Sequence, residues 1–223
     1  TWTVGLTTVP ARRGTHLPRT LASLATAGFD APRLFVDGEA DCQSWRAPFG
    51  LEVTCRWPNL RTFGNWAFAL AELYVRDPWA ERFAVFQDDL VCCRDLRAYL
   101  DSCEYPTGKG YWNLYLFPKN EAHAVRQGRE GWYESNQRGL GAVGLVFDRE
   151  AVLALLTSRH MAERPLDRRR GWRAVDGGIV TAMNKAGYRE MVHYPSLVQH
   201  TGDVSSMGNK PHPLAGSFRG EGW

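Results

Sequence analysis

The sequence lacks the features that would place the protein in a membrane, a zinc-binding class or a disulfide-framework class. Its cleanest apolar stretch, residues 139–147, is far shorter than the roughly 20 residues that a membrane helix needs. Its five cysteines are odd in number and include no C-x-x-C pair. Buried thiols in a reducing compartment are therefore favoured over a zinc site or paired cysteines. We expect a cytoplasmic protein without a membrane partner.

Lysine is scarce, and a glycine-rich phosphate loop is missing from the sequence. The 27 basic residues are 23 arginines and 4 lysines, and the formal net charge is +3. Arginine is the better residue for bidentate contacts with phosphate, although a GC-rich genome gives the same bias. The segment that follows the first apolar run, TTVPAR, has no glycine-rich fingerprint. A phosphate site in this chain must therefore use other groups.

The remaining composition is that of a globular chain. Hydrophobic residues make up 44% and charged residues 23% of the 223 residues, which excludes disordered, collagen-like and coiled-coil proteins. The length leaves no room for two independent catalytic domains. We expect a single domain over residues 1–223, with a flexible tail at 207–223, because the end of the chain is rich in Gly, Ser and Pro.

Strand and helix patterns alternate along the first hundred residues. Short runs of apolar and β-branched residues predict strands at 2–7, 33–36, 51–55 and 83–86. Apolar residues at helical spacing predict helices at 17–27 and 65–75. This alternation predicts an α/β fold with a mostly parallel central sheet flanked by helices.

The second half of the sequence is less regular. Strands are predicted at 111–117 and 142–147, and helices at 149–156 and 177–186. The polar, arginine-rich segments between these elements are predicted to be surface loops, at 120–138 and 161–173.

Two adjacent carboxylates follow the strand predicted at 83–86. Phe83–Leu90 reads FAVFQDDL, so a buried apolar strand runs directly into Asp88 and Asp89. In open α/β sheets, ligands bind beyond the carboxyl ends of the strands, and carboxylates there can hold a divalent cation on a diphosphate. Capping of a following helix by Asp88 is the structural alternative.

The QDDL segment resembles the D-x-D type of motif in the GT-A class of nucleotide-sugar-dependent glycosyltransferases, and is similar to the EDDL or EDDI segment of N-acetylglucosaminyltransferases. A second segment, His193–Ser206 (HYPSLVQHTGDVSS), resembles the P-S-L-x-Q-H-x-G-x-x-S-S stretch of branching enzymes in that group. Gln87 stands where the relatives usually have an acid. The resemblance implies a GT-A-like (Rossmann-like) fold, with a nucleotide-sugar-binding half at 1–110 and an acceptor half at 111–206.

The resemblance also implies roles for single residues. Asp89 would coordinate Mn²⁺ or Mg²⁺ on the two phosphates, and Asp88 would contact ribose or a metal-bound water. His200 would complete the metal shell or bind the diphosphate, since imidazole is an acceptable ligand for Mn²⁺; a structural histidine is the alternative. The base and ribose would be held by a segment that is otherwise an ordinary loop, through Thr7, Thr8 and Arg12.

Three further polar residues stand at the starts of predicted helices. Arg61 and Asn65 are placed to reach the nucleotide, and helix initiation explains them equally well. Asp176 precedes Gly177, Gly178 and a helix. An acid in this region of the relatives deprotonates the acceptor hydroxyl as a general base, while a helix cap is the structural alternative. With Asp176 as the base, we expect inversion at the anomeric carbon.

Arginine and aromatic residues are interleaved in the second half of the chain. Residues 125–138 and 164–173 together carry eight arginines and three acids, a local charge of 8 − 3 = +5. Sugars and nucleic-acid bases both stack on aromatic rings. The candidate rings are Trp112, Trp132, Tyr133 and Trp172. The acceptor is therefore either a saccharide or a hydroxymethylated base in DNA, flipped out of its duplex; a solvated basic face is the alternative.

These observations predict a metal-dependent glycosyltransferase. It would move a hexosyl or N-acetylhexosaminyl group from a nucleotide sugar, UDP-linked by preference, to a hydroxyl group. A nucleotidyltransferase of related fold is an alternative, but such enzymes normally have a Gly-rich, Lys-containing loop after the first strand. A non-catalytic module that binds sugar or nucleic acid is the other alternative.

Overall fold

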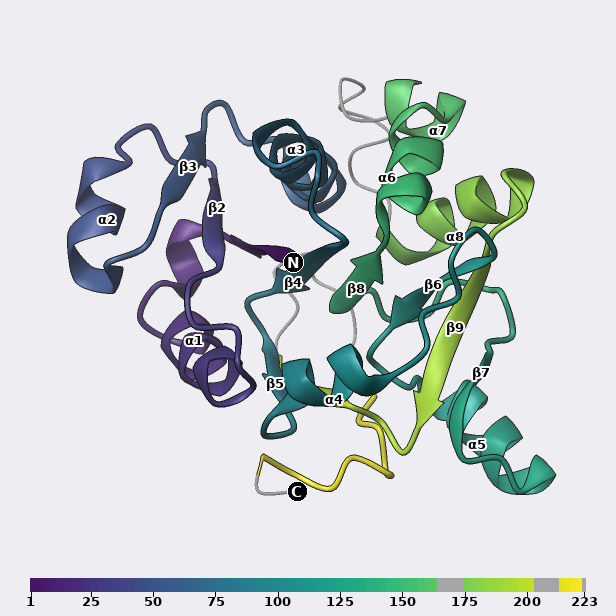
Figure 1. Ribbon diagram of the computed structural model, residues 1–223. Helices are drawn as coiled ribbons and strands as arrows, with labels where there is room; N and C mark the ends of the chain where they lie inside the picture. Colours follow the sequence, from purple (N-terminus) through teal and green to yellow (C-terminus); the bar gives the residue numbers. More distant parts are fainter. Residues whose placement is uncertain (164–174, 203–212, 222–223) are drawn as a thin grey trace.

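The computed structural model describes residues 1–163, 175–202 and 213–221, which form an α/β fold (Figure 1). In this part of the chain the central sheet has eight strands in the order β3-β2-β1-β4-β8-β6-β9-β7. These strands are β1 (Trp2–Thr8), β2 (Arg33–Asp37), β3 (Val53–Arg56), β4 (Arg82–Gln87), β6 (Gly110–Asn113), β7 (Gly131–Glu134), β8 (Gly144–Phe147) and β9 (Arg189–Tyr194). Only β7 and β8 run against the others. The mostly parallel sheet predicted from the sequence is confirmed.

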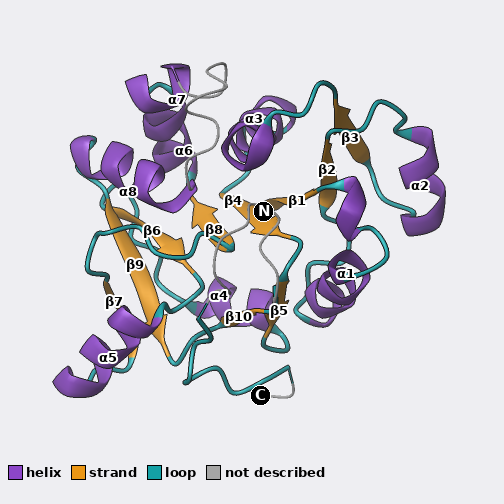
Figure 2. Cartoon of the chain, turned by 180° about the vertical axis from the view of Figure 1, so that it is seen from behind, coloured by secondary structure: helices purple, strands orange, loops and turns teal. Residues whose placement is uncertain are grey.

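Helices cover both faces of this sheet (Figure 2). The helices are η1 (Pro10–Arg12, a 3-10 turn), α1 (His16–Thr26), α2 (Gln43–Phe49), α3 (Arg61–Arg76), α4 (Leu96–Ser102), α5 (Pro118–Gln127), α6 (Arg149–Leu156), α7 (Arg159–Glu163) and α8 (Val175–Lys185). On one face the core includes α1 and α4, and on the other it includes α3, α6 and α8. Two short strands, β5 (Leu90–Cys92) and β10 (Val198–His200), form a separate antiparallel pair.

The apolar run that precedes the two carboxylates is buried on both faces. Along β4, Phe83 and Val85 belong to the cluster under α3, whereas Ala84 and Phe86 belong to the cluster under α1. Successive side chains of a strand point to opposite faces, so a strand covered on both sides needs an unbroken apolar run. This run fixes β4 in the middle of the molecule, and its end fixes the position of the acidic pair.

The prediction of a surface loop at 120–138 is wrong, because the segment forms α5 and β7. Pro118 stands in the first turn of α5, and Gly128 ends the helix with φ 57°. Only Asn120 and Ala124 of this helix are buried, so its sequence shows no apolar period. The short strand β7 lies at the sheet edge. Of the loop predicted at 161–173, the first residues belong to α7, and residues 164–173 lie outside the described residues.

The strand predicted at 111–117 is shorter than expected. It ends at Asn113, whose side-chain oxygen accepts a hydrogen bond from the Tyr115 amide at 3.2 Å. An Asn side chain bonded two residues on closes a turn of its own. The turn was not predicted because Asn113 is a single polar residue within an apolar run.

The expectation of unpaired thiols is wrong for two of the five cysteines. Cys42, just before α2, forms a disulfide with Cys55 on β3, and their Cα atoms are 5.5 Å apart. Cys92, Cys93 and Cys103 are free. Packing of α2 beside β3 brings together two residues whose spacing matches no known motif. With one disulfide present, the cysteines no longer favour a reducing compartment. Among the described residues, no helix is both long and apolar enough to cross a bilayer.

Part of the predicted flexible tail contacts the body of the protein. Ala215 is buried, and it exchanges hydrogen bonds of 2.9 and 3.0 Å with the Gln199 side chain. Glu121 on α5 accepts hydrogen bonds from the amides of Gly216 and Ser217. Residues 203–212 and 222–223 lie outside the described residues.

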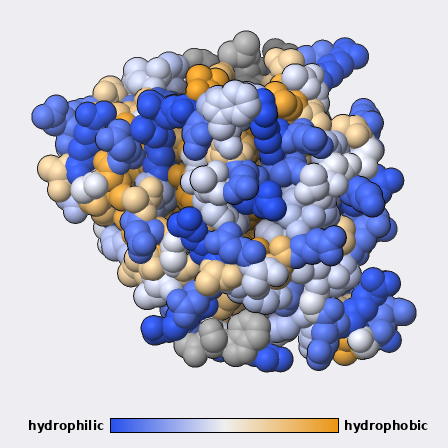
Figure 3. Space-filling view, viewed as in Figure 1, coloured by the Kyte–Doolittle hydropathy of each residue, from blue (hydrophilic) through white to orange (hydrophobic). Residues whose placement is uncertain are grey.

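The molecular face seen in Figure 3 is mostly hydrophilic, with apolar side chains scattered between polar ones. Large apolar residues that are more than 70% exposed include Trp57, Val75 and Trp79. Single exposed apolar side chains are common on proteins. They identify no site by themselves.

Candidate active site

The strand order of the sheet has a switch point between β1 and β4. The chain proceeds from β1 to β2 on one side, whereas β4 lies on the other side of β1. Ligands of open α/β folds bind outside the carboxyl ends of the strands at such a switch point. Thr7 pairs with Gln87 at the ends of these two strands. Thr8, Asp88 and Asp89 therefore lie together just beyond the ends of these two strands.

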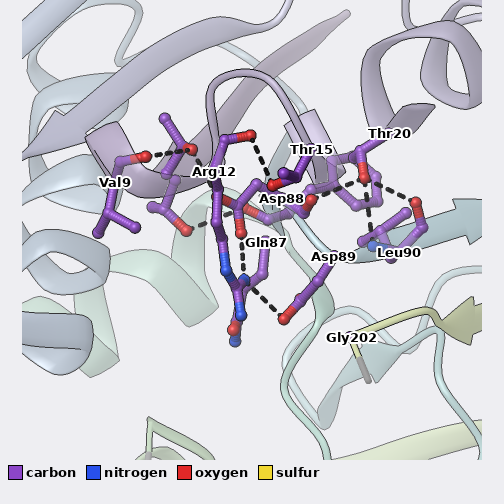
Figure 4. Close-up of polar contacts among 12 residues, drawn as sticks. Val9, Arg12, Thr15, Thr20, Gln87, Asp88, Asp89, Leu90 and Gly202 are labelled. Carbon is purple, nitrogen blue, oxygen red and sulfur yellow. Dashed lines mark hydrogen bonds and ion pairs between the residues drawn. The ribbon is translucent and has the colours of Figure 1, made fainter. Parts of the chain in front are cut away.

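Asp88 is held from two sides. It is 3% exposed, and it accepts hydrogen bonds of 2.5 Å from the Thr8 hydroxyl and from the Arg12 guanidinium (Figure 4). Its backbone oxygen accepts a hydrogen bond from Thr20 at 2.9 Å. Burial raises the pKa of Asp88 above its ordinary value, and the charge of Arg12 opposes this effect. The predicted neighbours Thr8, Arg12 and Asp88 are therefore in direct contact.

Asp89 contacts the same guanidinium through only one of its two carboxylate oxygens. Arg12 donates to Asp89 Oδ2 at 2.7 Å (Figure 4). The other oxygen, Oδ1, is buried and accepts no hydrogen bond from any described residue. A buried carboxylate oxygen normally has a partner, and a divalent cation is one that suits it. The Asp89 carboxylate therefore fits the metal predicted for this position.

The two sequence motifs meet because β10 pairs with β5. His200 stands opposite Leu90 in this pair, and its Nε2 lies 3.5 Å from Asp89 Oδ2. Its Nδ1 accepts the Gly202 amide proton at 3.0 Å, so in the neutral ring Nε2 carries the hydrogen. In this arrangement His200 presents an N–H group to Asp89 and no lone pair to a cation. Direct ligation would require the Gly202 hydrogen bond to break.

Gly202 is tightly enclosed by the same residues. A Cβ atom at this position would lie 2.7 Å from His200 Cε1 and 3.0 Å from Asp89 Oδ2. The site therefore accepts only glycine without movement of the metal-site candidates.

No cluster of three or more His, Cys, Asp or Glu that could hold a metal occurs among the described residues. A cation on Asp89 would therefore need further ligands from water or a bound molecule, as is usual for Mg²⁺.

Two other predicted nucleotide contacts, Thr7 and Asn65, already have hydrogen-bond partners within the protein. Thr7 donates to the Phe86 carbonyl at 3.2 Å, which joins β1 to β4. Asn65 is 3% exposed, donates to the Phe35 carbonyl at 3.1 Å and accepts from Arg56 at 3.0 Å. These hydrogen bonds give both residues a structural function. Their contacts with nucleotide stay predictions.

Sequence reasoning missed Asp37, the last residue of β2. This carboxylate is 2% exposed, and its Oδ1 accepts the Leu60 amide proton at 2.7 Å. Burial raises the pKa of Asp37, while the Leu60 hydrogen bond lowers it. Arg61, with φ 67°, begins α3 beside this carboxylate and interacts with it electrostatically. The signal in the sequence was an acid directly after an apolar strand, as at Asp88.

Asp176 stands at the start of α8 and is linked to the acidic strand through one loop. Its Oδ2 accepts the Gly141 amide proton at 2.6 Å. The next residue of that loop, Ala142, accepts a hydrogen bond from the Gln87 side chain at 2.7 Å. Asp176 is half-buried, and its carboxylate supports the loop at the carboxyl end of β4. This position suits the predicted general base but does not test it.

The aromatic residues of the second half form core contacts. Trp112 is 1% exposed and stacks on Trp132, with ring centroids 4.6 Å apart. Tyr133 is 4% exposed. Because their rings are covered by protein, Trp112 and Tyr133 are not open stacking platforms for an acceptor. Trp172 lies outside the described residues.

A cavity of about 520 Å³ opens at the other end of the strands, where β1 and β2 begin. Its arginines already have acidic partners. Arg33 and Arg76 contact Glu72, and Arg97 contacts Asp101. The carboxylates at the end of β4 are the better candidate site, because Asp89 Oδ1 has no hydrogen-bond partner among the described residues.

Glu190 is a buried carboxyl group on β9. Burial raises its pKa to about 6, against hydrogen bonds from Ser135 and Asn113 that lower it. The charge of Asp176 also raises the pKa of Glu190. Protonation of Glu190 therefore favours the folded state, and its ionisation between about pH 4.5 and 6 weakens it.

We expect Glu190→Gln to remove this pH dependence, since glutamine resembles the protonated acid. The stability of the variant relative to wild type should rise by about 2 kcal/mol between pH 4 and pH 8. Urea unfolding at several pH values measures it, with the exposed Glu134→Gln on the neighbouring strand as the control. A constant difference between variant and wild type would show that Glu190 does not titrate in this range.

No protein-family model and no curated protein matches the sequence. Solved structures do share its fold. GalNAc-T7 with UDP, GalNAc and Mn²⁺ has a TM-score of 0.55 and 12% identity, and the match covers 89% of this chain and 43% of that one. TarS from S. aureus has a TM-score of 0.51 and 14% identity, and the match covers 91% of this chain and 37% of that one. The catalytic domain of Drosophila β1,4-galactosyltransferase 7 with xylobiose has a TM-score of 0.50 and 13% identity. That match covers 95% of this chain and 75% of the domain.

These similarities define the class of fold. The chain spans less than half the length of GalNAc-T7 and of TarS, and about three quarters of the galactosyltransferase domain. At 12–14% identity the likeness concerns the fold alone. The protein has the GT-A-like fold of glycosyltransferases, as its sequence motifs predicted.

Proposed function

We propose that this protein is a metal-dependent glycosyltransferase that uses a nucleotide sugar, UDP-linked by preference. The observation that carries the proposal is the pair of buried carboxylates at the β1/β4 switch point, where one Asp89 oxygen has no hydrogen-bond partner among the described residues. The GT-A-like fold supports the same conclusion. GalNAc-T7, which shares it, was solved with UDP, GalNAc and Mn²⁺.

In this proposal the first half of the chain binds the donor. Thr8 and Arg12 fix the Asp88 carboxylate, so that it can accept hydrogen bonds from ribose or from a metal-bound water. Thr7, Arg61 and Asn65 border the nucleotide, and Asp37 is a further acceptor at the end of β2. Asp89 would hold a divalent cation, Mn²⁺ or Mg²⁺, which would supply Lewis-acid stabilisation of the leaving diphosphate.

The second half binds the acceptor and removes its proton. Asp176 acts as the general base on the acceptor hydroxyl, on the side opposite the departing diphosphate, and the product has inverted configuration. Its hydrogen bond with Gly141 orients the carboxylate. His200 orients the Asp89 carboxylate through the hydrogen on its Nε2. Alternatively, His200 would ligate the cation after its hydrogen bond with Gly202 is broken.

The preferred acceptor is a saccharide, to which a hexosyl or N-acetylhexosaminyl group is transferred. The galactosyltransferase domain with this fold was solved with xylobiose. A hydroxymethylated base in DNA is the second acceptor, and its support is the net positive charge of residues 125–138 and 164–173. The nucleotidyltransferase alternative is weaker, because the β1 loop has no lysine.

Mass spectrometry of acceptors tests this function. The protein would be incubated with Mn²⁺ and a panel of nucleotide sugars, together with oligosaccharides or with duplex DNA containing 5-hydroxymethylcytosine. We expect a mass increase of one hexosyl or N-acetylhexosaminyl group on an oligosaccharide. Modified DNA instead would select the second acceptor. Tight donor binding without any transfer or donor hydrolysis would favour the non-catalytic module.

A further inference from the structure

One cationic group bridges both carboxylates of the site. Arg12 NH1 lies 2.5 Å from Asp88 Oδ1 and 2.7 Å from Asp89 Oδ2 (Figure 4). The three side chains are 13%, 4% and 5% exposed, respectively. The Arg12 charge therefore neutralises one of two negative charges at a site that solvent barely reaches.

The backbone that presents Arg12 is fixed, while its side chain is long. The Arg12 amide donates to the Val9 carbonyl at 3.0 Å, and its carbonyl accepts from the Thr15 amide at 3.2 Å. Pro10 stands in the first turn of η1. Movement of the guanidinium therefore requires only rotation about side-chain bonds, which is fast compared with movement of a loop.

We propose that Arg12 and the divalent cation compete for this carboxylate pair, and that Arg12, when displaced, turns to the diphosphate of the donor. The proposal rests on the proposed function, because it takes Asp89 as the metal ligand. It assigns Arg12 to metal loading and phosphate binding, in place of the base and ribose contact expected from the sequence.

The competition follows from charge and distance. A cation on Asp89 would lie within a few ångströms of the guanidinium, and like charges at such a separation repel strongly in a poorly solvated site. The incoming diphosphate reverses the balance, since it adds negative charge that a planar guanidinium binds in a bidentate manner. The metal alone must therefore displace Arg12, whereas the metal with a diphosphate gives Arg12 a new partner.

The consequence is a coupling between metal and donor. A binding site that is open for only part of the time has its apparent affinity reduced by that fraction. Arg12 thus weakens metal binding to the free protein and strengthens binding of the diphosphate to the metal-loaded protein. By linkage, each ligand then favours the other. Substitution of Arg12 should change the two affinities in opposite directions, which a purely structural residue would not do.

The test is a titration with Mn²⁺ alone, in which electron paramagnetic resonance measures the free ion. We expect Arg12→Met to bind Mn²⁺ about tenfold more tightly than wild type, and Arg12→Lys to lie between them. At saturating Mn²⁺, calorimetry should show that UDP binds Arg12→Met about tenfold more weakly. Arg13→Met is the matched control, since Arg13 contacts Ser44 and Trp45 instead, and it should change neither affinity.

Equal or weaker Mn²⁺ binding by folded Arg12→Met would overturn the competition, and would leave the metal-dependent function standing. Absence of Mn²⁺ binding by every variant, with and without UDP, would overturn both. If Arg12→Met does not fold, wild type and Arg12→Lys decide. Tighter Mn²⁺ binding by Arg12→Lys supports the competition, and equal binding overturns it.

Discussion

Asp89→Asn is expected to abolish glycosyl transfer while the fold survives. The substitution removes the negative charge of the carboxylate whose buried Oδ1 has no hydrogen-bond partner in the described part of the chain. A metal ligand contributes several kcal/mol of transition-state stabilisation, so turnover should fall by about 1,000-fold or more. Initial rates of UDP release at saturating Mn²⁺ measure the loss, and circular dichroism with thermal unfolding measures the fold.

The matched control is Asp30→Asn. Asp30 is an exposed residue just before the amino end of β2, at the end of the strands opposite to Asp89. It should leave turnover and Mn²⁺ dependence at wild-type values. Full turnover of Asp89→Asn would exclude Asp89 as the metal ligand. A low turnover that accompanies loss of the folded state would be a structural effect and is distinguished by the unfolding curve.

Asp176→Asn is expected to lower turnover by about 100-fold or more, the usual contribution of a general base, with donor affinity unchanged. Asparagine cannot take the acceptor proton, but its side-chain oxygen can still accept the hydrogen bond from Gly141. The substitution therefore separates chemistry from support of the loop. Steady-state kinetics and UDP calorimetry give the two values.

Asp176→Ala serves as the comparison, because it removes the base and the Gly141 hydrogen bond together. The alanine variant should lose thermal stability that the asparagine variant keeps. If Asp176→Asn retains wild-type turnover, the base is another residue, and Asp176 has only the structural function that its contact with Gly141 provides.

The first half of the fold was predictable because its core is simple. β4 is apolar on both faces, and α1 and α3 each bury one side, so the sequence patterns of strand and helix are strong there. α5 was missed because it buries only Asn120 and Ala124. The disulfide was missed because it depends on how α2 packs beside β3, which no local pattern specifies.

The site was predictable where its residues follow apolar strands. Asp88 and Asp89 were identified as candidates in this way, and Asp37 follows the same rule. Pairing of β10 with β5 explains why two motifs far apart in sequence meet at Asp89. The direct contact of Arg12 with both carboxylates could not be predicted, because it depends on the course of the loop after β1.

The most direct test of the proposed function is the release of UDP from a panel of UDP-sugars by wild-type protein, with Mn²⁺ and with excess EDTA. We predict slow release with Mn²⁺ for at least one UDP-sugar, acceleration when an oligosaccharide acceptor is added, and none of it in EDTA or with Asp89→Asn. Release that is unaffected by EDTA would contradict metal dependence. Absence of both UDP release and UDP binding would contradict the proposed function itself.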